Sequence, residues 1–134
     1  MTSSSAATLA ELLRRFDAFR QLEDGDLQWL AERARPCHCG IGQELLLPDR
    51  LPETCYAIVE GRGRVLHTDP GLRRPVTLAY AQPGDLVGWA GLACRQPCEW
   101  ITAVTPLKLI GISAADFLEL ERRSASFAAW IDHN

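Results

Sequence analysis

The hydrophobic residues near the start of the chain recur with the period of an α-helix. They stand at the i, i+3, i+4 and i+7 positions of one face: Leu9, Leu12, Leu13 and Phe16. This spacing predicts an amphipathic helix that follows a polar, disordered tail of residues 1–8. A second helix is predicted to start near Asp24, a favourable N-cap residue type, and to end before Pro36. It directs four residues toward the core: Leu27, Leu30, Ala31 and Ala34.

Between about residues 36 and 112 the pattern changes to short β-type segments separated by Gly, Pro and Asp. The clearest is the stretch from Thr54 to His67, which predicts a β-hairpin because Gly61 allows the positive φ of a tight turn. Further strands are expected at residues 44–47, 76–80, 100–104 and 108–112, with turns at residues 69–71, 82–85 and 105–106. Many short strands at this spacing predict a sandwich, jelly roll or small barrel.

The helical period returns after the last predicted strand. Ser113 and Asp116 form a variant of the capping box, with Ser113 as N-cap and Asp116 at N3. Five apolar residues then recur at helical spacing: Phe117, Leu120, Phe127, Trp130 and Ile131. We expect them to cover the β-core, with a partner-binding helix as the alternative. The chain is therefore predicted to form a single domain over residues 9–134, with helices to about 35, a β-roll over 36–112 and helices over 113–134.

The composition is typical of one compact domain: 134 residues, of which 47% are hydrophobic and 23% charged. A net charge of −3 argues against a nucleic-acid-binding surface, which needs clustered Lys and Arg. The chain shows neither a long apolar run nor a signal-peptide pattern, so a cytoplasmic location is expected. Contact with a membrane is expected only indirectly, through an attached transporter.

The five cysteines and three histidines do not stand at metal-ligand spacings. Cys37-x-Cys39 and Cys94-x3-Cys98 differ from the C-x2-C pairs of zinc sites, and no H-x-H pair occurs. Buried, reduced thiols are expected instead, because free Cys packs as a small hydrophobic residue. No nucleophile–base arrangement is recognisable, so the protein is predicted not to be an enzyme.

Several short motifs occur in a characteristic order. They are F-x-x-L at residues 19–22, G-Q-E-L-L at 42–46, Y-A-I-V-E-G at 56–61, P-G-D-L-V-G at 83–88 and the strand leading to D-F at 116–117. This set resembles the cyclic-nucleotide-binding domain of the catabolite-activator family and of cyclic-nucleotide-regulated kinases and channels. The resemblance implies a mainly β fold with flanking helices, a double-stranded β-helix or jelly-roll-like β-roll.

The same resemblance implies that residues 84–100 form the ligand cradle. In the family, helix-terminal amides hold a cyclic phosphate, an Arg neutralises it, and a Glu accepts from the ribose hydroxyl. Here Trp89 stands at the Glu position and is expected to occupy the ribose space, while Pro97 and Cys98 stand near the Arg and Ser/Thr positions. The candidate cradle residues are Gly88, Trp89, Ala90, Gly91, Leu92, Arg95, Cys98 and Glu99.

The favoured hypothesis is a non-catalytic regulatory or sensor domain with a degenerate phosphate cradle. In an alternative, Arg95 neutralises the phosphate and Glu99 accepts from the ribose hydroxyl, so that the domain binds cAMP or cGMP. If they do not take these roles, Arg95 and Glu99 form an ordinary exposed pair. A truncated transcription regulator is a further alternative. Gly88-Trp89 and residues 97–100 also resemble the amino-terminal cyclic-nucleotide-like domains of certain bacterial ABC-type exporters. The expected partners are other domains of a larger protein or a separate protein, with a homodimer left open.

Overall fold

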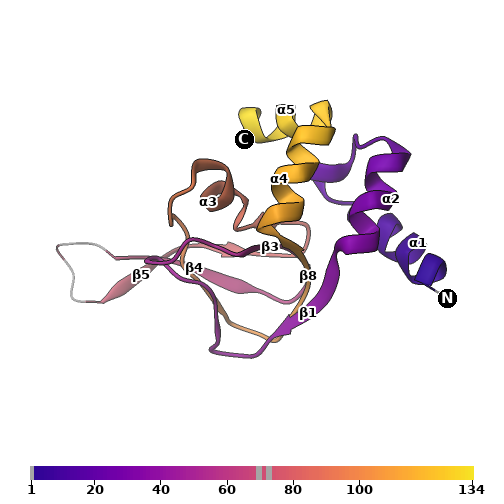
Figure 1. The fold of residues 1–134 in the computed structure, drawn as a ribbon. Helices are drawn as coiled ribbons and strands as arrows, with labels where there is room; N and C mark the ends of the chain where they lie inside the picture. Colours follow the sequence, from indigo (N-terminus) through magenta and orange to yellow (C-terminus); the bar gives the residue numbers. More distant parts are fainter. Residues whose placement is uncertain (1, 69–70, 72–73) are drawn as a thin grey trace.

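Two four-stranded antiparallel sheets form the body of the molecule in the computed structural model, which describes residues 2–68, 71 and 74–134 (Figure 1). One sheet has the strand order β1-β8-β3-β6 and the other the order β2-β7-β4-β5. The strands are β1 Arg35–Cys39, β2 Glu44–Leu46, β3 Thr54–Glu60, β4 Gly63–Thr68, β5 Pro75–Ala81, β6 Leu86–Val87, β7 Ile101–Ala103 and β8 Leu107–Ser113. The predicted β-roll with flanking helices is confirmed.

The predicted hairpin between residues 54 and 67 is wrong, although both of its strands exist. β3 pairs with β6 and β8, whereas β4 pairs with β5 and β7, so the chain changes sheets between Glu60 and Gly63. Gly61 has a φ of +100° at this corner. A corner between sheets and a hairpin turn both favour glycine at positive φ, and the local sequence does not distinguish them.

The turns and short strands of the β-roll follow the prediction only in part. The turn at residues 82–85 is present: the Asp85 amide donates to the Gln82 carbonyl oxygen, and the Asp85 carboxylate accepts from the Gln82 amide. The turn predicted at residues 69–71 includes Asp69 and Pro70, which lie outside the described residues. Two strands, β1 and β6, were not predicted, because β1 contains Pro36 and β6 has only two residues.

Three helical segments precede the β-roll: α1 Thr2–Leu13, the 3₁₀ helix η1 Asp17–Phe19 and α2 Asp24–Arg33. The helix over Thr2–Leu13 corrects the predicted disordered tail, since residues 2–8 contain no Gly or Pro that would interrupt it. The N-cap of α2 is Glu23, and Asp24 instead accepts a 2.9 Å hydrogen bond from Arg14. The four residues predicted to face the core from α2 are all buried.

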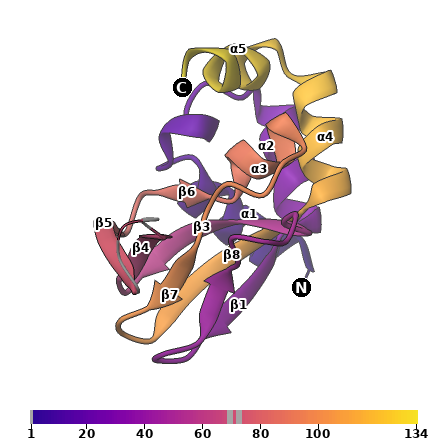
Figure 2. The same ribbon diagram turned by 90° about the vertical axis from the view of Figure 1, so that its left-hand side faces the viewer.

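Two helices follow the β-roll, α4 Ala114–Arg123 and α5 Ala125–His133. The predicted cap of α4 is confirmed, because the Ser113 side chain accepts from the Asp116 amide. Ser124 separates the two helices, and its side chain accepts a 3.1 Å hydrogen bond from the Phe127 amide. This second cap turns α5 away from α4 (Figure 2).

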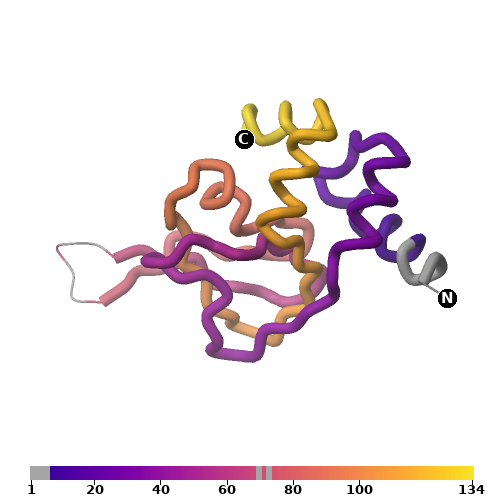
Figure 3. Tube along the Cα trace, viewed as in Figure 1, coloured from indigo at the N-terminus to yellow at the C-terminus, as the bar shows by residue number. Residues whose placement is uncertain are grey.

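The helices at the two ends of the chain lie on the same side of the β-roll, as the chain trace shows (Figure 3). Strand β1, which follows α2, pairs antiparallel with β8, which precedes α4. This pairing brings the two helical segments together. A core of buried side chains, including Phe19, Leu30 and Phe127, fills the space between them and the sheet, and a second core lies within the β-roll. Within the described residues, no helix has the length and apolar character needed to cross a membrane.

Candidate functional site

The short helix α3 Trp89–Cys94 forms the centre of the predicted cradle and follows β6 directly. Gly88, its N-cap, has a φ of +88°. A Cβ atom at this position would lie 3.1 Å from the Thr54 carbonyl oxygen and 3.2 Å from the Cys55 Cα. Glycine therefore permits both the left-handed backbone and the close approach of α3 to β3.

Glu99 contacts the beginning of α3 from the strand side of the loop. Its carboxylate Oε1 accepts a 2.9 Å hydrogen bond from the Gly88 backbone amide. The side chain is partly buried, and this burial raises the pKa of the Glu99 carboxyl, while the hydrogen bond from Gly88 acts in the opposite direction. A carboxylate of the protein itself thus lies at the amino-terminal end of the cradle helix.

Arg95 lies at the opposite end of α3, where it is the C-cap. It has a φ of 56°, and its backbone amide donates to the Gly91 carbonyl oxygen. Its side chain is exposed and forms no ion pair with Glu99, both residues being among those described. The predicted exposed ion pair between Arg95 and Glu99 is therefore absent from this structure.

Trp89 packs toward the carboxyl-terminal helices. Its ring lies edge-to-face on Trp130 of α5, with 4.9 Å between the ring centroids. Trp130 in turn stacks on Phe127 at 6.4 Å. The Trp89 ring therefore joins α3 to α5.

The cysteines are free, but they are not all buried as predicted. Cys39 and Cys55 are buried and Cys37 is partly buried, whereas Cys94 and Cys98 are exposed beside the cradle loop. Cys94 is the last residue of α3, and Cys98 lies on the loop that follows this helix. No group of three or more His, Cys, Asp or Glu residues suited to a metal ion occurs in the part of the chain that the structure describes.

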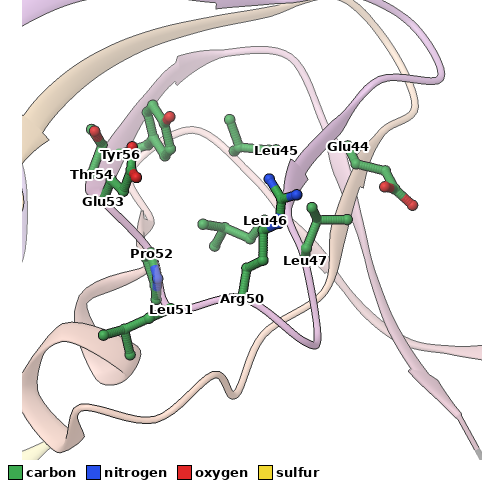
Figure 4. A pocket seen from close by; sticks show the side chains of 10 residues that line it. All are labelled: Glu44, Leu45, Leu46, Leu47, Arg50, Leu51, Pro52, Glu53, Thr54 and Tyr56. Carbon is green, nitrogen blue, oxygen red and sulfur yellow. The ribbon is translucent and has the colours of Figure 1, made fainter.

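A hollow of about 230 Å³ lies next to the cradle, between β2 and the start of β3 (Figure 4). We call it the β2–β3 hollow, and it is lined by residues 44–47, 50–54 and 56. None of residues 88–99 lines it, but Pro52 in its wall packs on α3: a Cβ at Gly91 would lie 2.9 Å from the Pro52 ring. Sequence reasoning missed this feature, and the only signal was a charged loop, D-R-L-P-E, between two apolar strands.

The raised pKa of Glu99 leads to a prediction about pH and stability. The folded state holds the Glu99 proton more tightly than the unfolded chain, so the free energy of unfolding falls as the pH rises above the ordinary carboxyl pKa of 4.5. A Glu99→Gln variant keeps an acceptor for the Gly88 amide and lacks this titration. We expect the variant to gain stability relative to the native protein between about pH 4 and pH 7, measured by urea denaturation. A difference that does not change with pH would contradict this assignment.

A family model described as the cyclic nucleotide-binding domain matches residues 38–124. This region includes β2 to β8, the cradle and all of α4. No curated protein matches the sequence.

Solved structures with the same fold come from several organisms. The regulatory domain of Toxoplasma gondii PKA with cAMP is 16% identical with a TM-score of 0.85, over 97% of this chain and 49% of that one. The regulatory subunit of a cAMP-independent protein kinase A from Trypanosoma cruzi, bound to guanosine, is 14% identical with a TM-score of 0.78. The match covers 98% of this chain and 50% of that one. The N-terminal domain of a Streptomyces coelicolor transcriptional regulator is 23% identical with a TM-score of 0.73, over 91% and 85%. The chain spans about half of the length of the first two structures.

Proposed function

The chain belongs to the cyclic nucleotide-binding domain family, and we propose that it is a non-catalytic regulatory domain whose cradle no longer holds a cyclic phosphate with the affinity typical of the family. The observation that carries this proposal is the hydrogen bond between the Glu99 carboxylate and the Gly88 amide. This contact uses a backbone donor at the start of α3 and adds a negative charge there. A phosphate in the same place would be repelled by that charge.

The position of the cradle cation supports the same conclusion. Arg95 caps the carboxyl-terminal end of α3, whereas Gly88 caps its amino-terminal end, and the helix has six residues. At 1.5 Å of rise per residue, the two ends are about 9 Å apart. The backbone of Arg95 is therefore far from a phosphate bound at the start of α3. Its exposed guanidinium would have to fold back along the helix to make a bidentate contact with that phosphate.

The contact between Trp89 and Trp130 provides a route for regulation. It joins the cradle helix directly to α5 at the end of the described chain. A ligand that moves α3 would change this contact and so alter the surface that α5 presents to a neighbouring domain. We propose that this neighbour belongs to a larger cytoplasmic or membrane-attached protein, with a bacterial ABC-type exporter as the candidate, on the sequence likeness around Gly88 and Trp100.

The test is an isothermal titration of the folded domain with cAMP and cGMP, with tryptophan fluorescence recorded in parallel. We expect neither heat nor a fluorescence change at micromolar concentrations, because each lost hydrogen bond to a charged phosphate weakens binding about tenfold to hundredfold. Circular dichroism on the same sample shows that the domain is folded.

Micromolar binding of either nucleotide would contradict the proposal. The matched variant Arg95→Ala would then identify the cause. Loss of binding in this variant would make the domain a cyclic-nucleotide sensor with a relocated arginine.

A further inference from the structure

We propose that the β2–β3 hollow is a second binding site, outside the cradle, and that it takes a guanine base. In this site Arg50 donates to O6 and N7 of the base, and Glu53 accepts from its N1–H and N2 amino group. The inference goes beyond the proposed function, because none of residues 88–99 lines the hollow.

The two charged groups face the hollow from different sides. Figure 4 shows the Arg50 guanidinium pointing inward from the loop after β2, while Glu53 lies across the hollow beside Tyr56. Among the described residues, neither side chain has a hydrogen bond or an ion pair, with each other or with a third group. The five donors of Arg50 and the two oxygens of Glu53 are therefore free for a ligand.

The third charged residue of the lining is already engaged. Glu44 accepts a 3.2 Å hydrogen bond from the Trp100 indole nitrogen, and Figure 4 shows its carboxylate turned away from the hollow. The lining thus contains two carboxylates and one guanidinium. Because there is no excess of positive charge, the hollow suits a neutral ligand better than a phosphate.

The distribution of donors and acceptors selects among neutral ligands. Arginine forms paired hydrogen bonds with the O6 and N7 acceptors of guanine, and a carboxylate accepts from the donors on its other edge. Adenine reverses the pattern, since it presents an amino group where guanine has O6 and an acceptor where guanine has N1–H. An α-amino acid carries its two charged groups on one carbon atom, so it does not span opposite walls.

The remaining lining supplies apolar contacts for the faces of a ring. Leu45, Leu46, Leu47, Leu51 and Pro52 make up half of the lining residues. Leu46 is 6% exposed and forms part of the β-roll core, whereas Leu51 is 49% exposed at the rim. A hollow of about 230 Å³ is below the size of drug-sized pockets and suits a single base, with the ribose left outside.

The experiment is a calorimetric titration of the 134-residue chain with guanosine, inosine and adenosine. We expect guanosine to bind, inosine to bind about tenfold more weakly because it lacks the N2 amino group, and adenosine not to bind. Arg50→Gln and Glu53→Gln are each expected to weaken guanosine binding at least about tenfold. Both residues are exposed and unpaired, so these variants should fold, as a thermal melt will verify.

Arg95→Gln is the matched control, since Arg95 is an exposed arginine of the cradle loop. Guanosine binding that survives Arg95→Gln and is lost in Arg50→Gln supports the site. Absence of guanosine binding, equal binding of adenosine, or loss of binding only in Arg95→Gln would overturn it. None of these results depends on the cyclic nucleotide titration, so failure of this inference and failure of the proposed function are distinguishable.

Discussion

Replacing Phe127 by Ala is expected to lower the free energy of unfolding by about 3–5 kcal/mol, the range for a buried Phe truncated in a packed core. Phe127 is fully buried at the junction of the terminal helices. Its ring lies 5.7 Å from that of Phe19 and 5.3 Å from that of Phe117. The substitution leaves a cavity among η1, α4 and α5, and urea denaturation of both proteins measures the loss.

The control for this prediction is Leu118→Ala on the neighbouring helix α4. Leu118 is 39% exposed, so its truncation should change the unfolding free energy by well under half of the Phe127 effect. Similar losses in the two variants would contradict the assignment of Phe127 to the centre of the helical core.

Replacing Gly61 by Ala is expected to destabilise the protein by about 2–5 kcal/mol, from backbone strain and overpacking together. Gly61 has a φ of +100° at the corner between the two sheets. A Cβ atom there would overlap the carbonyl oxygen of Pro106 and lie 2.9 Å from Leu107 Cδ2. The Arg62 amide donates to the Thr105 side chain at 2.9 Å, so the facing segment is held close to the corner.

The Gly84→Ala variant separates the contribution of backbone strain from that of overpacking. Gly84 also has a φ of +100°, but a Cβ atom there would have nothing within 4 Å. The Gly84→Ala variant should therefore be destabilised by the backbone strain alone, about 1–2 kcal/mol. Equal destabilisation of the two variants, measured by urea denaturation, would show that the close approach to Pro106 contributes nothing.

Much of the secondary structure could be predicted from local pattern. The helix with Leu27 and Leu30, the Ser113 cap and most of the strands follow from spacing and from residue type within a few positions. The partner of each strand could not be predicted in this way. β3 and β4 are neighbours in sequence but belong to different sheets, because pairing depends on residues up to about 80 positions away, as between Arg35 and Gly111.

The candidate site also combines features that the sequence predicts with features that it does not. The position of the cradle around Gly88 was identified through the resemblance of P-G-D-L-V-G to the family motif, and the positive φ of Gly88 explains why glycine is favoured there. The role of Glu99 was not predicted, since its hydrogen bond to Gly88 spans eleven positions, across α3 and the irregular loop after it. The contact between Trp89 and Trp130 joins segments about forty residues apart, and no local signal marks it.

The sequence by itself determined where most helices and strands form and which glycines turn the chain. These properties depend on side-chain type and on backbone conformation over a few residues. Only the tertiary structure decided that Glu99 faces the start of α3, that Trp89 contacts α5, and that Arg50 and Glu53 face one hollow. Such contacts depend on how distant segments pack together, and burial and pairing set their energies.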